Sequence, residues 1–150
     1  CLGVGLGAHL MARALGARVM PGTSYRIGWA PLTLTPAGVA SPLRHVVGPV
    51  LHWHYDTLEL PNGAERLASS EACSDEAFAY GRNALALQFH VEGVAKKFER
   101  WLISRAPEIA ATPGASVTRL RADTARFARV AAAQGQRCLA EWLDQLQPRR

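Results

Sequence analysis

Apolar residues at helical spacing predict three helical segments in this chain. Residues 6–15 are mostly helix formers that follow alternating glycines, and Gly16 provides a natural stop. Residues 92–105 place their apolar side chains on one helical face. Residues 117–146 repeat this spacing over a longer stretch, where Gly135 predicts a break into two helices.

Shorter apolar runs between turn signals predict β-strands. Residues 84–89 (ALALQF) form a continuous apolar run that suits a buried strand. Further strands are expected at residues 27–35, 50–54, 65–69 and 77–80, and a loop or linker at 107–114. Strands interleaved with helices predict an α/β domain.

Composition excludes several classes of protein. The 150 residues are 49% hydrophobic and 19% charged, a balance typical of a globular domain. No apolar stretch approaches the roughly 20 residues of a membrane helix, so no membrane partner is expected. Three scattered cysteines are too few for a disulfide framework, which predicts a reducing, cytoplasmic location.

The net charge of +5 comes from an excess of arginine, much of it in the C-terminal third of the chain. Few aromatic residues lie among these arginines to stack on bases. The pattern favours a solvated helix face over a polyanion site, and no nucleic-acid partner is expected.

Two segments carry residue types that suit catalysis. The glycine-rich turn before residues 6–15 has the form of a nucleophile elbow, which projects one side chain from a strained strand-to-helix turn. Gln88-Phe89-His90-Val91-Glu92 places a histidine two residues from a glutamate at the end of a buried strand. Such a pair suits a general base and the carboxylate that orients it, although a buried structural histidine explains the same pattern.

The two segments together resemble the class I glutamine amidotransferases, especially the branch of the GMP synthase amidotransferase. LGVGLGAHLMA is similar to the family motif LGxCLGxQLLA, and QFHVE is similar to QFHPE. IGWAPLTLT, VLHWHYDTLELPNGAERLASS and EACSDEAFAYG are also typical of the family. The resemblance implies a doubly wound α/β sheet with flanking helices, a Cys-His-Glu triad and no cofactor.

The motif register places Gly5 where the family has its nucleophilic cysteine. Cys1 then falls on the strand before the elbow, and His9 replaces the family's glutamine. His90 and Glu92 keep their places, with Val91 where the family has proline. The resemblance implies a substrate-binding set of Leu6, His9, His54, Tyr55 and Asp56.

The family's earlier strands have no counterpart before Cys1, so the sheet is expected to lack its N-terminal strands. Residues 1–106 are interpreted as the C-terminal part of an amidotransferase domain, and residues 107–150 as a helical extension.

His52 and His54 alternate on an expected strand and therefore point to one face, with His45 nearby. A metal site, lining of the glutamine pocket and structural histidines all remain open, and pocket lining is favoured. No metal site is predicted, because no cysteine or distant ligand cluster completes a closed one.

The leading hypothesis is a glutamine amidotransferase homologue that is inactive because Gly5 replaces the nucleophile. Its expected partners are glutamine or a similar small amino acid, and a synthetase domain or subunit. The alternatives are an active glutaminase that uses Cys1, a non-catalytic binding or regulatory pseudoenzyme, and a pseudogene product without function.

Overall fold

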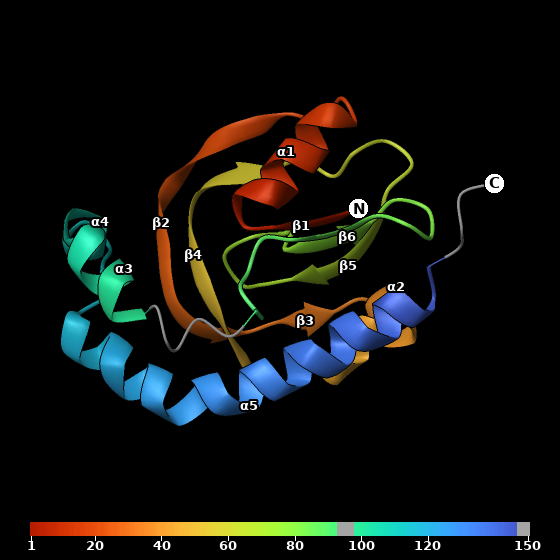
Figure 1. Ribbon diagram of the computed structural model, residues 1–150. Helices are drawn as coiled ribbons and strands as arrows, with labels where there is room; N and C mark the ends of the chain where they lie inside the picture. Colours follow the sequence, from red (N-terminus) through yellow and green to blue (C-terminus); the bar gives the residue numbers. More distant parts are fainter. Residues whose placement is uncertain (93–97, 147–150) are drawn as a thin grey trace.

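A computed structural model describes residues 1–92 and 98–146 (Figure 1). The elements in chain order are β1 (Leu2–Val4), α1 (Leu6–Ala14), β2 (Val19–Pro31), β3 (Thr33–Leu34), α2 (Pro36–Ala40), the 3-10 helix η1 (Pro42–His45), β4 (Pro49–Leu58), β5 (Glu65–Ser69), β6 (Ala77–Ala79), β7 (Leu85–Leu87), α3 (Phe98–Ser104), α4 (Ala106–Ala110) and α5 (Val117–Asp144). The α/β class predicted from the sequence is confirmed.

The strands form two sheets. Five strands pair in the order β1-β7-β6-β5-β3, where β1 and β7 are parallel and the other pairs are antiparallel. The long strands β2 and β4 make a separate antiparallel ribbon, which curves beside this sheet in Figure 1. An isolated bridge between Leu51 of β4 and His90 joins the ribbon to the chain that leaves β7. This bridge places the β2–β4 ribbon beside the Gln88–Glu92 segment.

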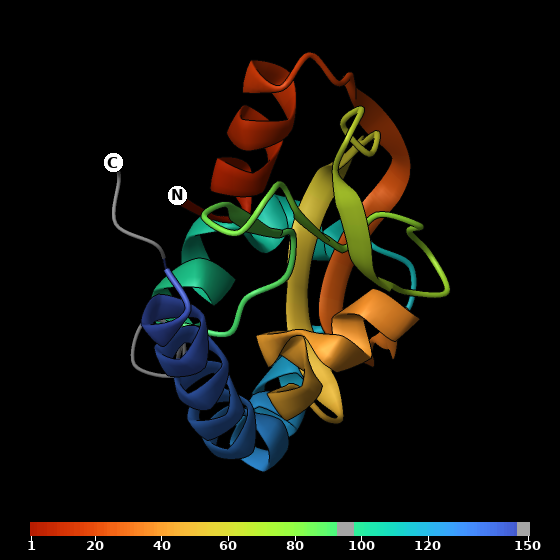
Figure 2. The ribbon, with the colours of Figure 1, turned by 90° about the vertical axis from the view of Figure 1, so that its right-hand side faces the viewer.

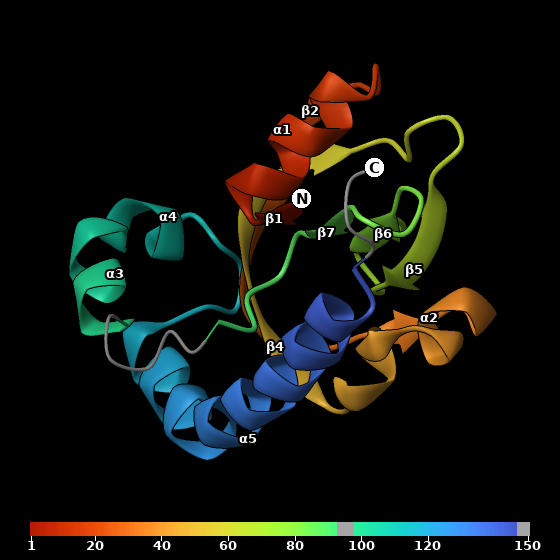
Figure 3. The same ribbon diagram turned by 45° about the vertical axis from the view of Figure 1, so that its right-hand side comes forward.

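The two faces of β7 pack against different helices. Ala86 clusters with Ala8 of α1, whereas Leu87 clusters with Cys138 and Trp142 of α5. Helices α1 and α5 accordingly lie on opposite sides of the molecule in the views of Figures 2 and 3. Burial of alternate residues on both faces explains why the sequence of this strand is apolar throughout.

Helix α5 runs without a break from Val117 to Asp144, so the predicted division at Gly135 is wrong. A Cβ built on Gly135 would overlap the carbonyl oxygen of Val91 and lie 2.8 Å from the Val91 Cβ. Glycine is therefore needed here for close packing of the helix against the chain after β7, and not to end the helix.

Other boundaries also differ from the sequence-based expectation. Strand β2 begins at Val19, well before residue 27, and it includes Pro21 and Gly22, which are typical turn residues. Its register with β4 shifts between Pro21 and Arg26, which accommodates them. Helix α4 lies in the segment expected to be a loop. Residues 93–97 of the expected helix 92–105 lie outside the described residues, and α3 begins at Phe98.

Helix α5 is tied to the rest of the chain by its apolar stripe and by polar contacts. Trp29 Nε1 donates a hydrogen bond to Thr124 Oγ1 at 2.9 Å, and Glu141 accepts from Arg44 and His45. The expected boundary near residue 106 stays a prediction. Within residues 1–92 and 98–146, none of the helices has the length and apolar character that crossing a membrane requires.

The three cysteines should differ sharply in reactivity. Cys1 is exposed, whereas Cys73 and Cys138 are buried, and burial together with nearby Glu141 raises the pKa of Cys138 to about 11. At pH 8 the folded chain should therefore react with iodoacetamide rapidly at Cys1 and very slowly at the other two. Peptide mass spectrometry after timed labelling measures this, with the urea-unfolded chain as control. Equal labelling of Cys1 and Cys138 in the folded chain would contradict the packing of α5.

Candidate functional site

Gly5 lies at the turn between β1 and α1 in the backbone geometry that the elbow motif predicts. Its φ is 56° and its ψ is −117°, and its N–H donates to the Leu87 carbonyl at 2.9 Å. Among the described residues, every positive φ belongs to a glycine. An L-residue at this position would be strained, whereas glycine adopts the conformation freely.

His90 lies directly beside this turn, although 85 positions separate it from Gly5 in the sequence. A Cβ built on Gly5 would stand 3.2 Å from His90 Cε1 and 3.5 Å from His90 Nε2. The parallel pairing of β1 with β7 accounts for this proximity, because both strands end at the same edge of the sheet. A side chain at position 5 would thus point at the imidazole.

Glu92 holds the other nitrogen of the same imidazole. His90 Nδ1 lies 2.7 Å from Glu92 Oε1, and the imidazole packs edge-to-face on Trp101, with ring centroids 5.0 Å apart. A carboxylate can only accept, so Nδ1 carries the proton and the neutral ring presents the Nε2 lone pair to Gly5. Burial acts to raise the pKa of Glu92, but the hydrogen bond from His90, together with the positive charge of this imidazole when it is protonated, holds that pKa below its usual value.

Cys1 lies before β1, and β1 separates it from the elbow. Its carbonyl accepts from Leu85 N–H at 3.0 Å, at the opposite end of the β1–β7 pair from Gly5. At about 3.3 Å per residue, the steps from Cys1 to Gly5 span about 13 Å. The structure therefore brings together Gly5, His90 and Glu92, and it does not place Cys1 among them.

The residues expected to bind substrate have different surroundings in the part of the chain that the structure describes. Leu6 is exposed beside Gly5, and His9 is buried with Nε2 2.7 Å from Gln88 Oε1. His54 and Tyr55 line a small cavity of about 210 Å³, and Asp56 offers its carbonyl to His54 Nδ1 at 3.0 Å. His9 thus faces a buried amide, whereas the ribbon residues border open space.

A cavity of about 430 Å³ lies elsewhere, between the β2–β4 ribbon and the start of α5. It does not include Gly5 or His90. Charged side chains of both signs line it, together with His52: Arg26, Glu71, Glu76, Arg119 and Asp123. Size alone therefore does not mark the elbow, which is identified by its backbone and its histidine.

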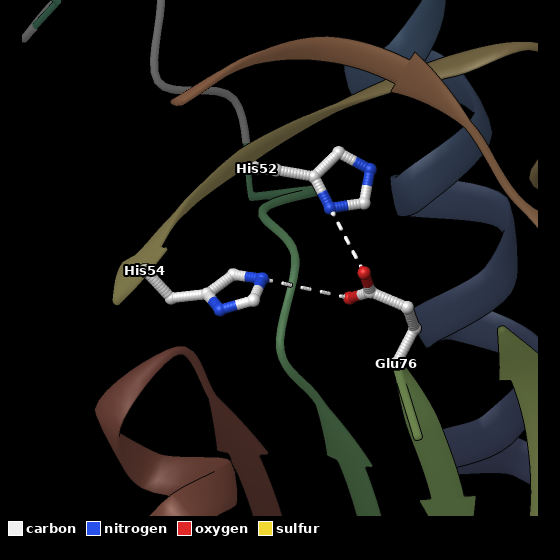
Figure 4. Close-up of side chains that lie close together, drawn as sticks. All are labelled: His52, His54 and Glu76. Atoms are coloured by element: carbon white, nitrogen blue, oxygen red, sulfur yellow. Dashed lines mark ion pairs between the residues drawn. The ribbon is translucent and has the colours of Figure 1, made fainter. Parts of the chain in front are cut away.

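Two further histidines meet a glutamate that sequence analysis did not single out (Figure 4). His52 Nδ1 lies 3.3 Å from Glu76 Oε1, and His54 Nε2 lies 3.9 Å from Glu76 Oε2. His45 is not part of this group, because it contacts Glu141. Glu76 directly precedes β6. The one sequence signal for it was a charged residue placed beside an apolar strand.

Comparisons with known proteins agree on one family. No protein-family model matches the sequence. The chain is 35% identical over 116 residues to the glutamine amidotransferase-like protein YfeJ of Salmonella typhimurium, covering 75% of this chain and 48% of the relative. It is 40% identical over 96 residues to a subunit of the glutamine-hydrolysing GMP synthase of Natronomonas pharaonis, covering 61% of this chain and 51% of the relative.

Solved structures agree in fold. A glutamine amidotransferase from Thermotoga maritima superposes with a TM-score of 0.81 at 29% identity, over 95% of this chain and 62% of that one. A glutamine amidotransferase from Methylobacillus flagellatus gives 0.82 at 25% identity, over 99% and 64%. The chain is homologous to the glutamine amidotransferases. It spans about half the length of the curated relatives it matches.

The glutamine amidotransferase relationship confirms the family resemblance and the mixed α/β fold predicted from the sequence. It leaves the roles of Gly5, His90 and Glu92, and those of the expected substrate-binding residues, as predictions. At the elbow itself, the His90 imidazole and the Glu92 carboxylate face a position that has no side chain.

Proposed function

We propose that this chain is a non-catalytic glutamine amidotransferase homologue, whose glutaminase centre keeps its histidine and glutamate but has lost its nucleophile. The observation that supports this proposal is Gly5 at the elbow, with His90 Nε2 3.5 Å from the point where a Cβ would stand. The ancestral reaction would be hydrolysis of the glutamine side-chain amide, which releases ammonia for an acceptor.

Glycine at position 5 removes the covalent route. In a Cys-His-Glu triad, the thiolate attacks the amide carbon to form a γ-glutamyl thioester, ammonia leaves, and water then hydrolyses the thioester. Without a thiol, His90 Nε2 has no proton to accept from position 5. Loss of the nucleophile from a triad typically lowers the rate by several orders of magnitude.

The alternative of Cys1 as nucleophile requires a different register. About 13 Å of strand separates Cys1 from the elbow, and the exposed Cys1 lies where its backbone pairs with Leu85. A thiol in that place has neither the turn geometry nor the imidazole of a triad. The non-catalytic hypothesis therefore fits the geometry better than the Cys1 hypothesis.

A binding role is the function that remains. The cavity of about 430 Å³ is lined by Arg26, by Glu71 and by the ion pair of Arg119 with Asp123 at 3.6 Å, charges of both signs that suit the carboxylate and ammonium groups of a free amino acid. We therefore extend the proposal to binding of glutamine or a similar amino acid. One relative is named as a GMP synthase subunit, so a synthetase subunit is the corresponding candidate partner here.

Glutamine hydrolysis should be undetectable with the purified chain. An ammonia-release assay over a range of glutamine concentrations measures this, with the Cys1→Ala variant run beside it. Glutamine-dependent ammonia that disappears in Cys1→Ala would show that the register is wrong and that the chain is a glutaminase.

Glutamine should raise the unfolding temperature of the chain in a thermal scan, because a ligand that binds only the folded state stabilises it.

A further inference from the structure

The cluster of His52, His54 and Glu76 contains none of the elbow residues and has no role in the proposed loss of glutaminase function. Both histidines come from β4 and point to one face of the ribbon, while Glu76 approaches from the start of β6 (Figure 4). Their side chains are 6%, 6% and 1% exposed. Such deep burial of three polar groups requires partners for every nitrogen and oxygen.

The outer nitrogen of each imidazole is held by a backbone carbonyl. His52 Nε2 lies 3.3 Å from the Ala30 oxygen, and His54 Nδ1 lies 3.0 Å from the Asp56 oxygen. A carbonyl oxygen can only accept, so each of these nitrogens carries a proton and donates. In the neutral rings, the inner nitrogens then present lone pairs toward the carboxylate of Glu76.

Two of the inner atoms have no hydrogen-bond partner among the described residues, namely His54 Nε2 and Glu76 Oε2. The 3.9 Å between them is too long for a hydrogen bond. Glu76 Oε1 is better satisfied, because Ser70 Oγ donates to it at 2.7 Å. A neutral imidazole lone pair that faces a carboxylate is repelled by it unless a proton or a metal ion lies between them. A proton can bridge His52 Nδ1 and Glu76 Oε1 at 3.3 Å, but none bridges the 3.9 Å between His54 Nε2 and Glu76 Oε2.

We propose that His52 Nδ1, His54 Nε2 and the Glu76 carboxylate bind one divalent first-row transition-metal ion, with Zn²⁺ as the reference ion. Two imidazoles and one carboxylate are a known donor set for such ions, and imidazole disfavours Ca²⁺ and Mg²⁺. The ligand atoms lie within 4.8 Å of one another. Zinc bonds of about 2.0–2.1 Å place tetrahedral ligands about 3.4 Å apart, so the widest separation has to close from 4.8 Å to about 3.4 Å.

The surroundings supply the other features of a metal site. The carbonyls of Ala30 and Asp56 fix the imidazole orientations, and the Ser70 hydroxyl fixes the carboxylate, as outer partners do around bound metals. His52 and Glu76 also line the cavity of about 430 Å³, which gives an ion and a fourth ligand, water or a small molecule, a route from solvent. This inference does not depend on the loss of the nucleophile at Gly5.

The test is direct metal binding to the full chain in a Cys1→Ala background, because the exposed Cys1 thiol and amino group could themselves chelate zinc. Co²⁺ should give visible d–d absorption that saturates at one equivalent, and Zn²⁺ should displace it. Glu76→Gln and His54→Gln should each weaken binding by about 100-fold or more, and Ser70→Ala by about 10-fold. His45→Gln is the matched control and should leave binding unchanged.

Circular dichroism establishes that each variant is folded, and the near-isosteric Glu76→Gln and the outer-partner Ser70→Ala keep the test valid if His54→Gln unfolds. Absence of a saturable Co²⁺ signal in the folded background chain overturns the proposal. Binding that Glu76→Gln, His54→Gln and Ser70→Ala all leave unchanged also overturns it, since the metal would then be held elsewhere.

Discussion

Replacing Gly5 by cysteine should create an acidic, reactive thiol. Its apparent pKa should fall within about 3.5–7.5 rather than near the 8.5 or so of a free cysteine. Two features of the structure lower it. The new side chain would point at His90 Nε2, 3.5 Å from its Cβ, and it would stand at the N-terminus of α1. Both the imidazolium and the helix dipole stabilise a thiolate.

The pH dependence of iodoacetamide alkylation measures this pKa. The experiment uses a Cys1→Ala background, and peptide mass spectrometry assigns the label to position 5. Gly7→Cys is a matched control, because a Cβ there meets nothing within 4 Å while the thiol stays in the first turn of the same helix. The thiol of Gly5→Cys should have a lower pKa than that of Gly7→Cys, and adding His90→Ala should abolish this difference. The difference therefore measures the effect of the imidazole, whereas the helix dipole acts on both thiols.

An unperturbed pKa in Gly5→Cys that His90→Ala leaves unchanged would contradict the residual triad geometry. The substitution should also lower the free energy of unfolding by about 1 kcal/mol or more, because a side chain at φ 56° is strained. Turnover is a poorer readout than alkylation, since His9 stands where the family resemblance places glutamine.

Substituting alanine for Gly135 should destabilise the fold, although it improves helix propensity. Propensity alone favours alanine by about 1 kcal/mol inside a helix. Here, however, the new Cβ would overlap the Val91 carbonyl oxygen and stand 2.8 Å from Val91 Cβ. The Val91 backbone cannot move away from this Cβ unless the chain after β7 shifts. The free energy of unfolding should therefore fall by about 1–3 kcal/mol.

Urea unfolding followed by circular dichroism measures the effect. Gln136→Gly is the control, because Gln136 is exposed on the same helix and its replacement reports propensity alone. The two variants should both destabilise. If Gly135→Ala instead stabilised the chain by as much as Gln136→Gly destabilised it, the close approach between α5 and Val91 would be absent.

Local patterns in the sequence predicted the main elements and the two segments that make up the candidate site. The apolar run at residues 84–89 contains β7, and the spacing after residue 116 predicted α5, because burial of one face or both imposes these periods. The His90–Glu92 pair could be predicted because its members lie two positions apart at the end of a strand. The alternating glycines likewise indicated a tight turn before α1, and the register of the family motif placed the elbow at Gly5, whose φ is positive.

Only the tertiary structure determined which distant segments meet. Parallel pairing of β1 with β7 sets His90 against Gly5, and the path of the chain into β6 sets Glu76 between His52 and His54. Gly135 shows the same limit, because a glycine that breaks a helix and one that admits a neighbouring backbone look alike in sequence. The periodicity of apolar residues shows which face of a helix or strand is buried. It does not show which distant segment packs on that face, because such contacts join residues far apart in the sequence.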